Sequence, residues 1–102
     1  MAKFIRRFDS SESLPELFQL AKEGVKEILG KERSGLMLGM ADLGMRPDWF
    51  VGAFYPVGSN IIVMNKTPLR FLEETKPKIV KPYCFHILLH EYLHSIGILD
   101  EN

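Results

Sequence analysis

The chain has 102 residues, a length that suits one domain rather than two. Its 13 basic residues balance 13 acidic ones, so it has no basic field that would attract nucleic acid or an anionic membrane. Cys84 is the only cysteine, which excludes an internal disulfide. With no signal peptide and no membrane span in the sequence, we expect a soluble cytoplasmic protein whose Cys84 is buried rather than reactive.

The first part of the chain predicts a strand followed by a helix. Residues 3–8 alternate in character as a strand does. Ser13 is then predicted to cap a helix, with Pro15 in its first turn and Glu16 completing a capping box. Apolar residues at helical spacing continue toward Gly30, where we expect the helix to end.

The middle of the chain is predicted to form a sheet. An apolar run over residues 36–40 predicts one strand, and residues 44–48 predict a loop. Residues 51–55 and 61–64 predict two further strands, which the turn at residues 56–60 would join as a hairpin.

Two helices are expected to close the chain. A short helix is predicted over residues 68–74, and Pro77 and Pro82 predict a break after it. The last helix is predicted from Pro82 to Ile96, with Gly97 as its stop. It is apolar almost all round, which favours a central position. We therefore expect an α+β domain with an N-terminal helix packed on a small mixed sheet and a buried C-terminal helix.

That last helix carries the pattern His90-Glu91-Tyr92-Leu93-His94, an HExxH motif. Residues four apart share one face of a helix, so His90 and His94 are predicted to bind one zinc ion. Glu91 is the predicted general base, acting on a zinc-bound water. A buried carboxylate between two imidazoles favours metal binding over two ordinary core histidines. His86 lies about 12 Å from His94 along the axis, so we expect it to pack or to support the ligands.

The motif supplies two ligands, whereas a catalytic zinc site commonly has three protein ligands and a water. No His follows His94 in the sequence. Gly97 and Asp100 extend the motif to HExxHxxGxxD, which resembles the metzincin peptidases and makes Asp100 a candidate third ligand. Glu101 and the terminal carboxylate are weaker candidates.

The segment Gly52-Ala53-Phe54-Tyr55-Pro56-Val57-Gly58, followed by residues 61–64, resembles the Asn-Ala-Phe-x-x-Gly edge strand and the next strand of gluzincins. At about 100 residues the chain resembles the minigluzincins, soluble relatives of the CAAX-protease and HtpX-like membrane peptidases. The resemblance implies a single zincin-like domain over residues 1–102, with a substrate-binding edge strand at Gly52, Ala53 and Phe54.

The resemblance also implies a third zinc ligand, a His on a C-terminal segment that can block the cleft. Here Gly52 replaces the Asn and no such His is present. Either a C-terminal segment is missing from the chain, or another residue completes the site.

Three functions remain open from the sequence. The first is a zinc-dependent endopeptidase, latent or autoinhibited, that acts on peptide or protein substrates. The second is a catalytically silent zincin-fold binding or regulatory module with an incomplete zinc site. The third is an interaction protein without metal. An uncovered apolar cleft beside the zinc would also favour self-association as a dimer or larger assembly.

Overall fold

The computed structural model describes residues 10–48 and 50–98, so the strand predicted over residues 3–8 lies outside the described residues. Within these ranges the chain forms a small α+β domain with three α-helices and a three-stranded mixed sheet. In chain order the elements are α2 (Ser10–Leu29), β1 (Met37–Ala41), β2 (Ala53–Phe54), β3 (Ile61–Asn65), α3 (Lys66–Thr75), the 3-10 helix η1 (Pro77–Ile79) and α4 (Val80–Ser95).

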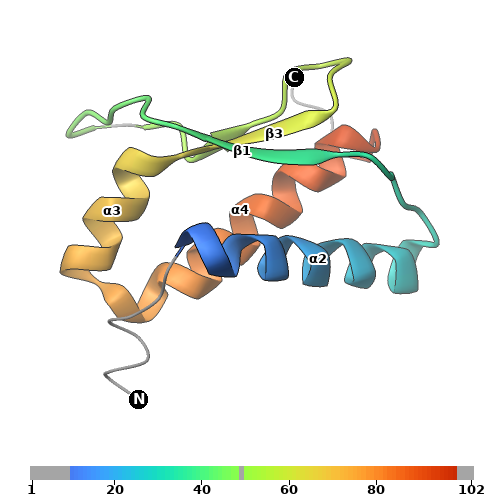
Figure 1. The fold of residues 1–102 in the computed structure, drawn as a ribbon, viewed down its shortest axis with the longest axis horizontal. Coiled ribbons are helices and arrows are strands. Elements are labelled where there is room, and N and C mark those ends of the chain that lie inside the picture. Colours follow the sequence, from blue (N-terminus) through green and yellow to red (C-terminus); the bar gives the residue numbers. More distant parts are fainter. Residues whose placement is uncertain (1–9, 49, 99–102) are drawn as a thin grey trace.

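The sheet has the order β1-β3-β2, so β3 is central and β2 is an outer strand. β1 pairs with β3 in parallel, and β2 pairs with β3 antiparallel, with Ala53 opposite Met64. The antiparallel pairing confirms the predicted hairpin. The sheet covers one side of α2 and α4, and α3 leads from the end of β3 back to the start of α4 (Figure 1).

The core lies between the sheet and these helices. Phe18 of α2 meets Tyr92 of α4 edge to face, with ring centroids 5.9 Å apart. Tyr92 is fully buried, and so are Ile62 and Met64 of the central strand. Burial of an apolar side chain of this size contributes about 1.5–3 kcal/mol, which makes this packing the main stabilising term of the domain.

Two predicted helix starts are wrong. α2 begins at Ser10, so Ser13 is not its cap, and Pro15 lies in the second turn instead of the first. In the second turn, Pro15 costs the helix the one hydrogen bond that its N–H would donate to the carbonyl four residues earlier. The neighbouring Leu14 is buried in the core. α4 begins at Val80, which places Pro82 in its first turn, where a missing N–H is tolerated. The predicted break between α3 and α4 is therefore confined to residues 76–79.

The predicted burial of α4 is correct for one of its faces. Cys84, Leu88 and Tyr92 are buried against the sheet and α2. On the other side, Phe85 and Leu89 line an open apolar groove between α2 and α4 with a volume of about 330 Å³. The all-round apolar character of this helix therefore reflects an inner face in the core and an outer face that is only partly covered. No helix in the described parts of the chain is both long and apolar enough to cross a bilayer.

Asn65, at the end of β3, is fully buried and holds three segments together. Its amide nitrogen donates to the carbonyls of Gly44 (2.9 Å) and Val51 (2.7 Å). Its Oδ1 accepts from the N–H groups of Leu43 (3.0 Å) and Thr67 (3.1 Å). One side chain thus fixes the segment after β1, the segment before β2 and the first turn of α3.

We expect Asn65→Ala to lower the free energy of unfolding by more than about 3 kcal/mol, because it leaves four backbone groups without their partner. Urea denaturation followed by circular dichroism measures this change. Asn60→Ala is the matched control, since Asn60 is exposed, and it should change the free energy by less than about 0.5 kcal/mol. Equal stability of the two variants would contradict the role assigned to Asn65.

Candidate metal centre

The HExxH residues occupy the last turns of α4, and the end of this helix is closed by a defined motif. Gly97 has φ +80°, and its N–H donates to the carbonyl of His94 at 3.0 Å. The N–H of Ile98 donates to the carbonyl of Leu93, also at 3.0 Å. This pair of bonds is a Schellman motif, which confirms Gly97 as the stop and satisfies carbonyls that a helix end leaves open.

Helical geometry brings the two predicted metal ligands together. The Nε2 atoms of His90 and His94 lie 3.0 Å apart, with the rings nearly perpendicular at 81°. Two nitrogens bound to a tetrahedral zinc at its usual bond length are about 3.3 Å apart. The imidazoles therefore need to separate by only a few tenths of an ångström to hold one ion, so the residues present fit zinc.

Glu91 is close to both imidazoles and is largely shielded from water. One ligand atom from each of His90, Glu91 and His94 lies within 4.8 Å of the others. Glu91 is 7% exposed, whereas His90 is exposed and His94 half-buried. The histidines can thus be reached from solvent while the carboxylate is positioned behind them. Such a group can hold a cation, which would also offset the cost of burying the carboxylate.

No further ligand joins this group in the part of the chain that the structure describes. Asp100 and Glu101, the candidates for a third ligand, lie outside the described residues. His86 is exposed on α4, so of the two alternatives expected for it, packing is wrong, and support of the ligands stays a prediction. It sits one turn before His90, on the side of the helix that faces solvent.

The start of β2 lies very close to α4. A Cβ at Gly52 would be 2.5 Å from Cδ1 of Ile87 and 3.1 Å from the hydroxyl of Tyr83. Any side chain here would force Ile87 to move. The absence of a side chain at Gly52 therefore lets the outer strand lie directly on the helix that carries the HExxH motif.

Arg33 joins the opposite end of this strand to the end of α4. Its guanidinium donates to the hydroxyl of Tyr55 (2.6 Å) and to the carbonyls of Ser59 and Ser95 (2.9 Å to Ser95). Its backbone N–H donates to the hydroxyl of Tyr92 at 2.9 Å. Arg33 thus ties the β2–β3 turn to the final turn of the helix, next to His94.

These two contacts define how β2 passes the motif. The strand segment meets α4 first at Gly52, beside Ile87, and again three residues later at Tyr55, which Arg33 links to Ser95. Strand and helix therefore run in the same general direction. His90 lies between the two contacts on the helix, so the outer strand passes alongside it.

The ladder geometry identifies which backbone groups of β2 face outward. The N–H of Asn65 donates to the carbonyl of Gly52 at 2.8 Å, so these residues form a hydrogen-bonded pair. Hydrogen-bonded and non-bonded pairs alternate in an antiparallel ladder. Ala53, opposite Met64, therefore turns its N–H and C=O to the free edge, and Phe54 turns back to β3. Of the three predicted substrate-binding residues, Ala53 directs its backbone groups to the outer edge, although the residue as a whole is only 9% exposed, and Phe54 has a partly exposed ring.

Two other side chains of α4, the thiol of Cys84 and the hydroxyl of Tyr83, stay protonated near neutral pH. Cys84 is fully buried, and burial together with the negative charge of Glu73 raises the pKa of its thiol to about 12. The hydroxyl of Tyr83 is buried without a hydrogen-bond partner among the described residues, and burial and Cys84 raise its pKa to about 12. The prediction that Cys84 is buried is confirmed, and neither group is a nucleophile for the site.

Sequence reasoning missed Arg33 and Asn65, which position the helix and the outer strand. Asn65 does carry a local signal, because Asn directly before a helix is a preferred cap, and it accepts from Thr67 in this role. Arg33 has no comparable signal, since its partners are distant in sequence.

Comparisons with protein-family models, with characterised proteins and with solved structures found no match to this chain.

We expect Gly52→Ala to lower the free energy of unfolding by about 1–3 kcal/mol, because the new methyl group overlaps Cδ1 of Ile87. Ile87→Val removes that atom, so the double variant should recover most of the loss. Thermal and urea denaturation of the four proteins in this cycle measure the coupling. Gly24→Ala is the control, because nothing lies within 4 Å of a Cβ there. Failure of Ile87→Val to rescue Gly52→Ala would contradict the close approach of strand and helix.

Proposed function

We propose that the chain is a zinc-dependent endopeptidase in which His90 and His94 hold the metal and Glu91 is the general base. The observation that carries this proposal is the 3.0 Å separation of the two Nε2 atoms, with a shielded carboxylate within 4.8 Å of them. Two imidazoles supply two of the three protein ligands that hydrolytic zinc sites commonly have, and the carboxylate between them is assigned as the base.

The chemistry follows from where these groups lie. When bound, zinc would acidify a water molecule and polarise the carbonyl of the scissile bond. The carboxylate of Glu91 takes a proton from the attacking water and returns it to the leaving amine, so that no covalent intermediate with the protein is needed. Its shielded position protects that proton from exchange with solvent, and the exposure of His90 leaves the site open to a peptide.

The outer strand supports a peptide as the substrate class. Ala53 presents its N–H and C=O along the free edge of β2, which passes alongside His90. An extended peptide can add to such an edge as a further strand and gain two hydrogen bonds from this one residue. This addition would position the peptide backbone across the face of α4 that carries the motif.

A second candidate is a zincin-like binding or regulatory module without turnover. The observation that favours it is the ligand count, since only two His and one Glu gather among the described residues. With Glu91 reserved as base, two protein ligands remain where catalytic zinc sites commonly have three. For the same reason we propose that the peptidase activity is latent until a further ligand completes the site.

The two candidates predict different results for Glu91→Gln. If the chain is a peptidase, the variant should retain zinc and its rate of peptide cleavage should fall at least about 100-fold. The substitution removes the base and leaves the imidazoles in place. Elemental analysis gives zinc per chain, and a fluorogenic peptide library gives the cleavage rate. His90→Ala should lose the metal, whereas His86→Ala on the same helix should keep it.

Cleavage by Glu91→Gln at the rate of the parent protein would rule out the assigned mechanism. Zinc binding without cleavage of any peptide would favour the regulatory module. A protein that takes up no zinc and cleaves no peptide would contradict the peptidase and agree with the regulatory module, whose zinc site is incomplete.

We also propose self-association through the apolar groove between α2 and α4. The groove has almost no polar lining, and Ile28 at its rim is 81% exposed. We expect Ile28→Glu to shift the protein toward the monomer, because a charge at the rim opposes burial. Light scattering across a wide concentration range measures this shift. Glu27→Lys, which changes a charge on the same turn, is the control. If the parent protein is a monomer at every concentration, the proposal is contradicted.

A further inference from the structure

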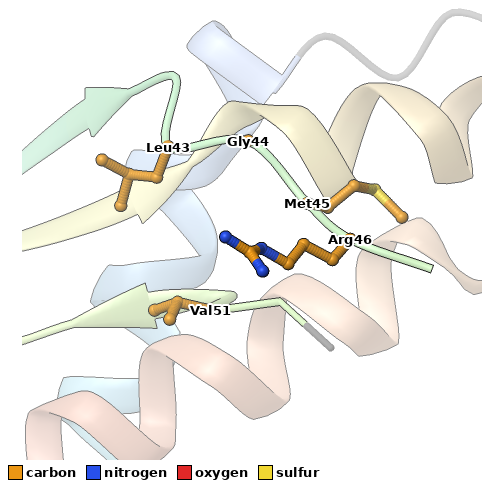
Figure 2. Close-up of a pocket in the computed structure, with 5 residues that line it drawn as sticks. All are labelled: Leu43, Gly44, Met45, Arg46 and Val51. Atoms are coloured by element: carbon orange, nitrogen blue, oxygen red, sulfur yellow. The ribbon is translucent and has the colours of Figure 1, made fainter. Parts of the chain in front are cut away.

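A pocket lies between the segment that follows β1 and the start of β2. It has a volume of about 260 Å³ and is lined by Leu43, Gly44, Met45, Arg46 and Val51. Figure 2 shows the side chain of Arg46 extending across it, with the guanidinium group between Leu43 on one side and Val51 on the other. The space can accommodate one amino-acid side chain, and its only charged lining residue is a cation.

The walls of this pocket are fixed from behind. The amide of Asn65 holds the carbonyls of both Gly44 and Val51, one from each wall. The N–H of Gly44 also donates to the hydroxyl of Thr67 at 3.1 Å. Because Asn65 is fully buried, the separation of the two walls is set by the core. The backbone of the pocket is therefore preformed, and a ligand would have to order only the exposed side chains that line it.

The guanidinium of Arg46 is available to a ligand. Within residues 10–48 and 50–98 no carboxylate forms an ion pair with it, whereas Arg70 and Lys26 in this range are each paired with one. The acidic side chain at the end of β1, Asp42, is paired with Arg70 at 3.4 Å. A guanidinium has five N–H donors in a planar arrangement that matches a carboxylate. The apolar side chains around it fit the methylene groups that carry such a carboxylate.

The pocket lies where a bound peptide would extend. Val51 is two residues before Ala53, about 7 Å along a strand, and Ala53 carries the outward-facing backbone groups of β2. A peptide that pairs antiparallel with β2, as β3 does, would run its C-terminal part toward Val51. A side chain one or two residues beyond the scissile bond would thus reach Arg46.

We propose that Arg46 and its pocket bind a carboxylate of the substrate, on the C-terminal side of the bond that is cleaved. This inference rests on the proposed peptidase function for its direction, but the binding itself requires no turnover. The carboxylate can come from an acidic side chain or from the end of a short peptide. The site would then select acidic substrates in a chain whose net charge is zero.

Binding of designed peptides to zinc-loaded Glu91→Gln protein tests the proposal. The probes are acetylated and amidated octapeptides of Ala and Leu in which one Glu or one Gln is moved through the positions. A Gln peptide with a free C-terminus separates the terminal carboxylate from an acidic side chain. We expect Glu at one position to strengthen binding about tenfold over Gln in fluorescence anisotropy. Arg46→Glu should remove this preference and favour Lys at the same position.

Lys78→Glu makes the same change of charge at an exposed site in η1 and should leave the preference intact. Equal binding of Glu and Gln peptides, or a preference that survives Arg46→Glu, would overturn the proposal. The parent protein separates this result from a failure of the proposed function. Cleavage without acidic preference would leave the peptidase standing and reject the pocket. If acidic peptides are preferred through Arg46 but no peptide is cleaved, the pocket stands and the peptidase function is rejected.

Discussion

The buried amide of Asn65 is the interaction on which the geometry of the candidate site depends. It forms hydrogen bonds with four backbone groups, and they belong to three different segments. Because one of these groups is the carbonyl of Val51, the amide sets where β2 begins. The start of β2 in turn decides where Gly52 meets α4, and hence how the outer strand lies beside His90. The predicted metal ligands lie on the helix, but their surroundings depend on the far end of the sheet.

The sequence predicted the parts of the site that depend on local geometry. The spacing of His90 and His94 brings their Nε2 atoms together because four residues make about one helical turn. Gly97 ends α4 because its positive φ closes the helix, and this too could be read locally. The start of α2 is where local reasoning was wrong, because Ser13 and Glu16 have the pattern of a capping box, yet the helix already begins three residues earlier, at Ser10.

The missed contacts share a different physical reason. Arg33 reaches Tyr92 and Ser95 across 59 and 62 residues of sequence, so its partners depend on how the whole domain closes. Gly52 gave no sign of its role either, because a missing side chain matters only once the helix beneath it is in place. Where the sequence resembled gluzincins, an Asn was expected at this position. The contact with Ile87 explains why this chain has no side chain there: the outer strand could not otherwise lie so near the helix.

The bonds made by Arg33 have a consequence for motion at the end of α4. The last turn of a helix ordinarily frays, since its amides open locally at little cost, far below the free energy of global unfolding. His94 lies in that turn, yet the turn is held to the β2–β3 connection by Arg33 and capped by the bonds to Gly97 and Ile98. Its amide hydrogens should therefore exchange slowly, together with those of the core. The two histidines would then stay close together without a metal, and little entropy would be lost if the proposed site takes one up.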